Sequence, residues 1–511
     1  MARWGVKLGG VKLGGVNLGA VKLALLAGAA IAAVPAQADT LREALAGAYR
    51  ANPTLQAARA DQRANDENVP IEKSAGRPDI AATGQYVEFL KQSSTSFTTP
   101  ERAINANVDL SVPIYSGGAV KNAVRAAEER VQAGQADLRA TESAIFSQVV
   151  AAYMDVIGNQ ALVGLAANQV DVLSTNLQAT SDRFEIGDLT RTDVAQSESR
   201  LALAQSDLRS AQANLIAARE NYVSLVGQAP DDLQPPPPLP GLPDSPNIAV
   251  DIALEDNPDL IAARELADAA GYDIDVAGSS RLPRVSLFTG YGYNNFLGTL
   301  GGAVTDPTLP DTNPSQTSSE AQAGVSISIP IFQGGRPAAL RRQAQARASS
   351  ALETVIAAER DVIAQVRAAY SSWQASLAII ESSQGAVSAA ELSLEGVRAE
   401  NSIGNRTILD VLNAEQELLN ARVELVTARR NAYVAGFSLL AAMGRAEARD
   451  LGLDGDGLLY DPQLNFERVE GKWWDWENDP APVVQSTRTV DIPAQDAEIP
   501  PQKSQPAAPA Y

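Results

Sequence analysis

The chain has 511 residues, a formal net charge of −20 at pH 7, and neither cysteine nor histidine. Without these residues, Ser-His-Asp and Cys-His catalysis and the usual zinc and haem ligand sets are excluded. The acidic balance argues against nucleic acid as a partner, because phosphates favour a basic surface. A chain of this length is expected to form several domains or an elongated repeat fold rather than one compact core.

Residues 1–38 have the features of a secretory signal peptide. An apolar stretch at 23–34 follows four basic residues, and Ala36-Gln37-Ala38 fits an A-x-A cleavage site. Beyond this leader there is no uninterrupted apolar run of about 18 residues or more, so we expect no membrane-spanning helix. Any membrane crossing is then expected to use strands.

Motifs from the first half of the chain recur in the same order in the second half. Asn52-Pro53-Thr54-Leu55 recurs as Asn257-Pro258-Asp259-Leu260, and an Ile-Gly pair followed by an Asp-Val pair occurs in both halves. We therefore predict two structural repeats, a Pro-rich extended linker between them, and a C-terminal tail. Their bounds are 39–228 and 248–445 for the repeats, 229–247 for the linker and 446–511 for the tail. The composition of the tail predicts that it is largely disordered, apart from an isolated aromatic cluster at 472–476.

Each repeat is predicted to contain a helix followed by a strand pair. The first helix opens on a Thr40–Glu43 capping box and is expected to reach about Ala75, with an interruption near Pro70. Apolar and polar residues alternate over 104–112 and 321–329, which predicts antiparallel strand pairs at about 79–114 and 284–331. The glycine pairs that follow would turn the chain from strand into helix: Gly117, Gly118, Gly334 and Gly335.

Alternation of this kind has two interpretations, a soluble half-buried hairpin or the strands of a transmembrane barrel. The leader and the absence of an expected spanning helix favour the barrel. Four strands cannot close a barrel, since the smallest known barrels have about 8. The barrel would therefore be shared between chains.

Long helices with a heptad repeat are predicted after each strand pair. Apolar residues recur every seven positions from Val124 to Ile145, from Val149 to Phe184 and from Val366 to Leu394. Returning helices make two hairpins, with tips at 184–193 and 401–410. The predicted fold is mainly α with a small β part: an elongated tandem repeat of a strand pair and a long, coiled-coil-like helical hairpin.

The two tips carry helix-end motifs. Gly187 and Gly404 fit the position just beyond a helix end. Thr190–Asp193 and Thr407–Asp410 fit the S/T-x-x-D/E helix start, in which the carboxylate favours the positive end of the helix dipole. Helix capping is thus sufficient to explain both aspartates.

Over residues 40–445 this organisation resembles the TolC-type outer-membrane efflux and type I secretion channels, most specifically in GNRTILDVLN (404–413) and IGDLTRTDV (186–194). The resemblance implies a homotrimer in contact with outer-membrane lipid, in which a twelve-stranded transmembrane β-barrel continues as a periplasmic α-helical barrel. It implies a passive exit duct without cofactor or metal. A periplasmic adaptor and an inner-membrane pump would open its entrance, and the adaptor would dock at the tip turns: Gly187, Thr190, Gly404 and Thr407.

The resemblance also implies roles at the entrance. Asp193 stands where the family has a carboxylate that links neighbouring hairpins, and Arg406 stands where it has the basic partner. Asp410 corresponds to an acidic ring at the constriction, with one carboxylate per chain. Asn413 replaces a second acidic ring of well-known members, and Asn401 replaces a tyrosine of some members.

Two other functions are alternatives to the duct. One is a periplasmic coiled-coil spacer or adhesin without a conducting lumen. The other is a secreted hydrolase with carboxylates as acid and base, which the lack of histidine and the scattering of acidic residues along repetitive helices disfavour.

Overall fold

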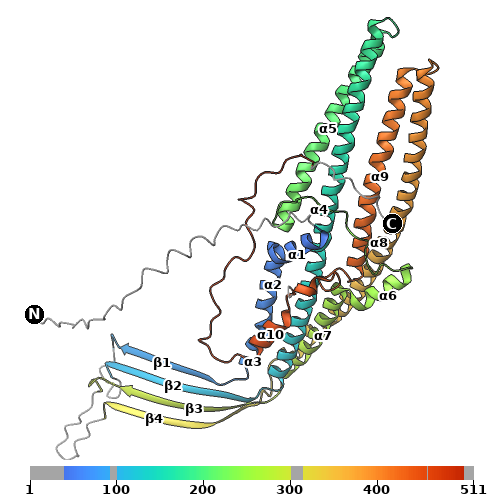
Figure 1. The fold of residues 1–511 in the computed structure, drawn as a ribbon. Coiled ribbons are helices and arrows are strands. Elements are labelled where there is room, and N and C mark those ends of the chain that lie inside the picture. The colour runs from blue at the N-terminus through green and yellow to red at the C-terminus, as the bar shows by residue number, and fades with distance from the viewer. Residues whose placement is uncertain (1–39, 92–99, 301–314, 457–458, 500–511) are drawn as a thin grey trace, which may run out of the picture.

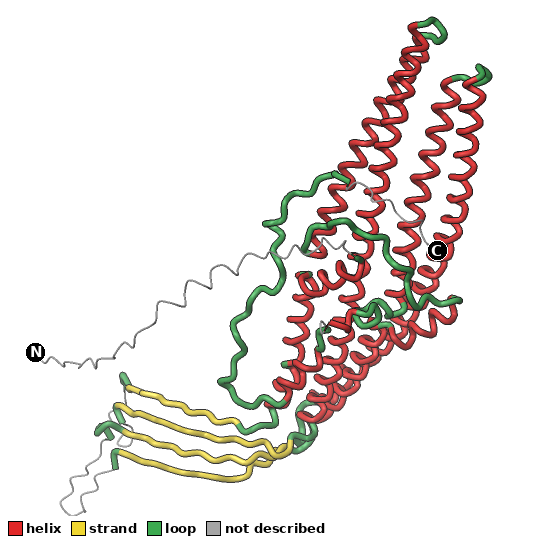
Figure 2. The backbone as a smooth tube through the Cα atoms, in the orientation of Figure 1, coloured by secondary structure: helices red, strands yellow, loops and turns green. Residues whose placement is uncertain are grey.

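The computed structural model describes residues 40–91, 100–300, 315–456 and 459–499. The molecule is elongated, with a four-stranded sheet at one end and the tips of two long helical hairpins at the other (Figure 1). Helices make up most of the described chain, and the strands are confined to the sheet (Figure 2). The expected signal peptide and most of the loop inside each strand pair lie outside the described residues.

The two repeats have matching elements in the same order. The first consists of α1 Leu41–Ala51, α2 Pro53–Asp66, α3 Asn68–Ser74, β1 Asp79–Glu88, β2 Arg102–Tyr115, α4 Ala119–Glu185 and α5 Arg191–Val226. The second consists of α6 Pro246–Asp256, α7 Pro258–Ser279, β3 Arg284–Asn295, β4 Thr317–Ser328, α8 Arg336–Ser402 and α9 Ile408–Ala442. The predicted order of strand pair, long helix and return helix is confirmed.

One asparagine in each repeat explains why the Asn-Pro motif recurs. The Asn52 side chain accepts hydrogen bonds from the first amides of α2, and its amide donates to the Leu225 carbonyl near the end of α5, at 3.0 Å. Asn257 caps α7 in the same way and donates to the Ala442 carbonyl at the end of α9, also at 3.0 Å. Both side chains are buried, so each ties the start of its repeat to the end of the return helix.

The heptad positions supply much of the core between the hairpins. The main cluster includes Leu138, Ile145, Val149, Val156 and Val163 of α4. Towards the second tip, Val387 and Leu394 of α8 pack with α9 in a separate cluster. At 67 residues each, α4 and α8 extend about 100 Å at 1.5 Å per residue, so the seam between helices must be long as well.

The sheet is antiparallel in the order β1-β2-β3-β4, so β1 and β4 are its edges. The register places Ile80 opposite Leu110, Val108 opposite Tyr291 and Leu287 opposite Val325, all on one face. The other face carries mainly polar side chains, among them Asn105, Asn107, Asp109, Gln322 and Ser326. One face of the sheet is therefore apolar and solvent-exposed in the single chain.

Glycine is needed where each strand pair joins its long helix. Gly117 and Gly118 have φ of 67° and 82°, and Gly334 and Gly335 have 59° and 82°. These angles lie in the left-handed region, which other residues rarely adopt. At Gly117 an added Cβ would also lie 2.8 Å from the Cβ of Leu282.

The N-terminal helix differs from the expectation of one helix broken near Pro70. It is broken twice, at Asn52 and at Glu67, and Pro70 lies within the first turn of α3, where its missing amide costs nothing.

The Pro-rich linker is also held in place: its Gln234 carbonyl accepts a 2.6 Å hydrogen bond from the Tyr153 hydroxyl of α4.

The prediction of a largely disordered C-terminal tail is wrong for the described part of the tail. A short 3-10 helix, Leu453–Asp456, and α10, Pro462–Glu470, follow α9, and α10 packs on α2 and α3. Farther on, the Arg219 guanidinium of α5 donates to the carbonyls of Asp496 and Glu498 at 2.7 and 2.8 Å. Residue composition missed this because the tail is ordered by contacts with other elements. Residues 500–511 lie outside the described part.

One helix of the described residues, α4, contains a stretch that by length and composition could cross a membrane, contrary to the expectation of none. The same helix contributes Phe146, Val149 and Tyr153 to the main core, each fully buried. A central helix in the core of a protein can have the same length and apolar composition as a membrane-spanning helix.

A buried carboxyl group holds the segment after α9 against α4. Glu142 accepts a hydrogen bond from the Ala448 amide, and the neighbouring Arg139 pairs with Glu447 at 2.6 Å. Burial, with a smaller contribution from the Glu447 charge, raises the pKa of Glu142 to about 7.

This raised pKa predicts a pH-dependent stability. Between the ordinary carboxyl pKa of 4.5 and about 7, the folded chain holds a proton that the unfolded chain has lost, so the free energy of unfolding falls as pH rises through this window. Glu142→Gln should weaken this dependence and stabilise the protein above neutral pH by on the order of 3 kcal/mol, while the raised pKa of Glu129 keeps part of the slope. Thermal unfolding followed against pH measures it, with the exposed Glu198→Gln as control. An unchanged slope in Glu142→Gln would contradict the assignment.

Candidate functional site at the helical tips

The first tip is a glycine-terminated helix end followed by a capping box. At the end of α4 the Gly187 amide donates to the Phe184 carbonyl and the Asp188 amide to the Arg183 carbonyl, both at 2.9 Å. Gly187 has φ of 82°, as this turn requires. The Asp193 carboxylate then accepts from the Thr190 amide and hydroxyl at 2.9 and 2.7 Å and starts α5.

The second tip repeats this geometry residue by residue. The amides of Gly404 and Asn405 donate to the carbonyls of Asn401 and Glu400 at 3.0 and 2.9 Å, and Gly404 has φ of 81°. Asp410 accepts from the Thr407 amide and hydroxyl at 3.0 and 2.8 Å. The recurrence of Ile-Gly and Asp-Val is thus explained by one turn made twice.

An ion pair joins each tip turn to the long helix before it, and the basic and acidic partners change places between the two tips. In the first, Arg183 on α4 meets Asp188 in the turn at 2.6 Å. In the second, Glu400 on α8 meets Arg406 in the turn at 2.7 Å. All four side chains are about half exposed, so each pair contributes little stability by itself and mainly orients its turn.

The capping hydrogen bonds keep both tip aspartates ionised. Donation from the Thr190 and Thr407 hydroxyls, with a smaller effect of the backbone amides, lowers the pKa of Asp193 and of Asp410 below 3.8. The Glu400 carboxylate, by its hydrogen bond and its charge, raises the pKa of Arg406. The tips therefore present fixed charges over the whole physiological pH range.

A buried carboxylate connects the two hairpins below their tips. Glu415 of α9 is 3% exposed, and it accepts hydrogen bonds from Arg398 of α8 at 3.0 Å and from Asn176 of α4 at 2.9 Å. Farther along, the Arg200 guanidinium of α5 donates to the Asn413 side chain at 2.9 Å. These polar contacts join the first hairpin to the second near the tips.

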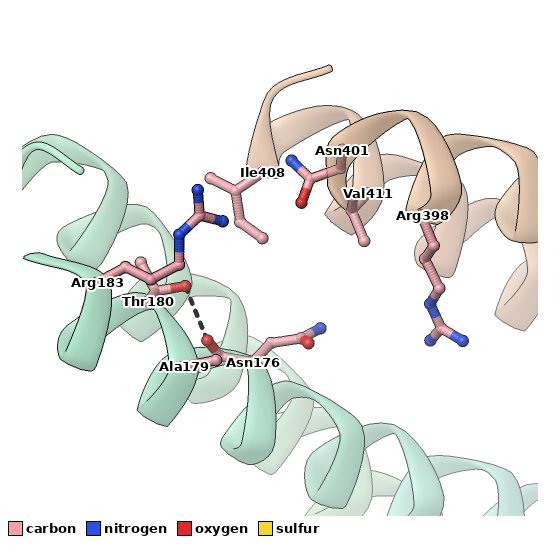
Figure 3. Close-up of a pocket in the computed structure, with 8 residues that line it drawn as sticks. All are labelled: Asn176, Ala179, Thr180, Arg183, Arg398, Asn401, Ile408 and Val411. Atoms are coloured by element: carbon pink, nitrogen blue, oxygen red, sulfur yellow. Dashed lines mark hydrogen bonds between the residues drawn. The ribbon is translucent and has the colours of Figure 1, made fainter. Parts of the chain in front are cut away.

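A cleft of about 220 Å³ lies beside Glu415, between the hairpins (Figure 3). Residues of α4 form one wall, and residues of α8 and α9 form the other. Arg183 and Arg398 extend towards the space from opposite sides, with Asn176 and Asn401 close by (Figure 3). The remaining lining residues are Ala179, Thr180, Ile408 and Val411.

The structure separates some residues that the resemblance associates with one another. Among the described residues no ion pair joins Asp193 to Arg406: Asp193 bonds to Thr190, and Arg406 pairs with Glu400 of its own hairpin. Asn401, which replaces a tyrosine of the family, donates to the Arg406 carbonyl at 2.8 Å and so supports the turn.

Glu415 was missed at the level of sequence, although a signal for it exists. Val411, Leu418 and Leu425 form a heptad track on α9 that is buried in the core of the second hairpin. Glu415 lies four residues after Val411 and three before Leu418, so it occupies a core-facing position of the same heptad. A charged residue at such a position indicates a specific polar partner.

The comparisons with known proteins agree with this architecture. The sequence model of the family described as outer membrane efflux protein matches residues 41–228 and 249–445. The chain belongs to this family. It is 34% identical to outer membrane efflux protein BepC of Brucella suis biovar 1 (strain 1330) over 450 residues, which cover 88% of this chain and 94% of BepC.

More distant relatives extend the likeness to structure. Outer membrane protein TolC of Escherichia coli (strain K12) is 25% identical over 471 residues, covering 88% of this chain and 93% of TolC. The solved structure of VceC from Vibrio cholerae matches with a TM-score of 0.66 at 23% identity, covering 79% of this chain and 96% of VceC. The chain is thus an outer-membrane channel of the TolC type and not an enzyme, and the spacer interpretation has no support.

The buried link at Glu415 yields a prediction. Glu415→Ala should loosen the hairpins near the tips by about 1–3 kcal/mol, because Arg398 and Asn176 lose their acceptor. Hydrogen–deuterium exchange of the segments around residues 176 and 415 measures this opening. Glu415→Gln keeps one acceptor oxygen, so its exchange should lie between that of the parent protein and that of Glu415→Ala.

Glu391→Ala is the matched control, since Glu391 pairs with Arg422 at 2.9 Å within the second hairpin and is half exposed. Equal exchange in Glu415→Ala and Glu391→Ala would show that the Glu415 link does not hold the hairpins together.

Proposed function

We propose that three copies of this chain close one barrel and form the exit duct of a tripartite export system, gated at the helical tips. The observation that supports it is the sheet, which has four strands, two unpaired edges and one apolar face. In a bilayer every backbone N–H and C=O group must be paired, so β1 of one copy is expected to pair with β4 of the next. Sharing in this way makes a twelve-stranded barrel, and the helical hairpins continue it as a periplasmic tunnel.

The entrance of this duct would be acidic. Asp410 is at the end of the second hairpin, its pKa is lowered by the Thr407 hydroxyl, and threefold assembly would bring three such carboxylates around one axis. Charged rings of this kind select ions in channels. Capping and gating are compatible roles, since the same carboxylate that starts α9 remains partly exposed.

A periplasmic adaptor would dock at the paired tips. The turns at Gly187–Thr190 and Gly404–Thr407 offer two similar surfaces per chain, and three chains would offer six. The cleft at Arg183 and Arg398 lies between these surfaces, so a bound adaptor that widens it would act directly on the link at Glu415.

Single-channel conductance in a planar bilayer tests the duct and its acidic constriction. The parent should conduct cations with a small conductance, and Asp410→Ala should conduct more and lose cation selectivity. A protein that inserts as a trimer but does not conduct would overturn the duct.

Thr407→Ala is the matched control for Asp410→Ala. It removes the hydroxyl from the capping box but keeps the carboxylate charge, so its conductance and selectivity should stay near those of the parent. If Thr407→Ala instead reproduces Asp410→Ala, the effect comes from a loosened helix start, and Asp410 is no constriction.

Gly404→Val tests docking at the second tip. An added Cβ at Gly404 meets no atom within 4 Å, so the substitution acts only by straining the left-handed turn, by about 1–2 kcal/mol. Export should be lost while trimers persist, because the docking turn is deformed. Gly452→Val, with φ of 69° and equally open surroundings far along the chain, should export normally. Normal export by Gly404→Val would remove this turn from the docking surface.

A further inference from the structure

Three tryptophans of the C-terminal segment are exposed in a way that the export function does not explain. Trp473, Trp474 and Trp476 are 53%, 70% and 90% exposed, directly after the ordered helix α10. Tryptophan has a large apolar ring with one polar N–H group, so exposure of three rings to water is unfavourable. The cluster therefore indicates a partner surface.

Contacts fix the cluster beside the start of the sheet. Arg77, two residues before β1, donates to the Lys472 carbonyl at 2.6 Å, and its guanidinium lies 4.8 Å from the centre of the Trp473 ring. Lys73 of α3 pairs with Glu470 at 3.7 Å. These contacts bring the tryptophans beside the connection from α3 to β1. Figure 1 shows α10 beside α3, close to where the strands begin.

Other large apolar side chains are exposed at this same level. Tyr115 at the end of β2 is 49% exposed, and Phe332, just after β4, is 88% exposed. The apolar face of the sheet begins here with Ile80, which is 69% exposed. The tryptophans therefore lie at the level where the apolar face of the sheet begins.

The charge around the cluster is mixed, with Asp475 between the tryptophans and the Arg77 guanidinium beside Trp473. Arg77 donates to a backbone carbonyl and forms no ion pair among the residues that the structure describes, so its positive charge is available to a phosphate. Rings of tryptophan and tyrosine with neighbouring cations are typical of the boundary between hydrocarbon and water.

We propose that the segment Lys472–Trp476 is a membrane-interface anchor that inserts its tryptophan rings among the phospholipids of the periplasmic leaflet. This inference rests on the proposed barrel, which places the start of β1 at that leaflet. It assigns the C-terminal tail a function: α10 holds the anchor against α3, and the anchor fixes the depth of the barrel in the membrane.

Tryptophan fluorescence in liposomes with brominated phospholipids tests the anchor. In the chain without the leader, Trp373→Phe leaves only the three anchor tryptophans. Bromines near the headgroup should reduce the fluorescence by at least about twofold, and bromines deep in the acyl chains should reduce it less, as expected for interfacial rings. Replacing the three anchor tryptophans by Phe leaves Trp373 as the matched control, which should not respond to either lipid, because it packs against Tyr370 in the helical part.

Each other result overturns the anchor. Quenching by aqueous acrylamide but not by brominated lipid would place the rings in water, and quenching by neither would place them against a second copy of the chain. Conductance of the same liposome preparation separates the two proposals. If the protein conducts but brominated lipid does not quench it, only the anchor is ruled out. If the protein neither inserts nor conducts, the barrel is ruled out as well.

Discussion

Pairing of backbone hydrogen-bonding groups is the constraint on which the architecture of this protein depends. The four strands satisfy one another inside the sheet, but β1 and β4 each leave one edge unpaired. In lipid such an edge is too costly to persist, so the chain alone is incomplete and assembly supplies the missing partners. The glycine pairs at 117–118 and 334–335 then carry each strand pair directly into a 67-residue helix, which transmits the symmetry of the barrel to the tips.

At the tips, one set of residues serves folding and, in the proposed duct, gating as well. Asp193 and Asp410 start helices by accepting amide hydrogen bonds, and the same bonds keep them charged. Glu415 differs from them, because it is buried and shared by three helices. An exposed carboxylate can act on passing ions without moving, whereas a buried one loses its partners when the hairpins part. An exposed carboxylate is therefore suited to selecting ions, and a buried one to holding the two hairpins together.

The C-terminal segment shows how composition can mislead. Its proline, alanine and glutamine content is typical of disorder, yet Asn465 bonds to the buried Asp66 and Arg219 holds the backbone at 496–498. These contacts come from α2 and α5, more than two hundred residues away in the chain. Order in such a segment is decided by the surface it meets, not by its own propensity.

Sequence alone determined the elements and their repetition. Period-two alternation, heptads, capping boxes and the Gly-Gly pairs are local properties, so they predicted the strands, the long helices and both tips to within a few residues. Capping by Asp193 and Asp410 was predictable for the same reason, because donor and acceptor are three residues apart.

Only the tertiary structure decided which distant residues meet. The Glu415 link to Arg398 and Asn176, the clamping of α5 and α9 by Asn52 and Asn257, the elevated pKa of Glu142 and the position of the tryptophans beside β1 all depend on packing between segments far apart in the chain. Within the single chain Arg406 pairs with Glu400 of its own hairpin. A local heptad can indicate that a residue such as Glu415 is buried, but which distant residues it meets is set by how the helices pack.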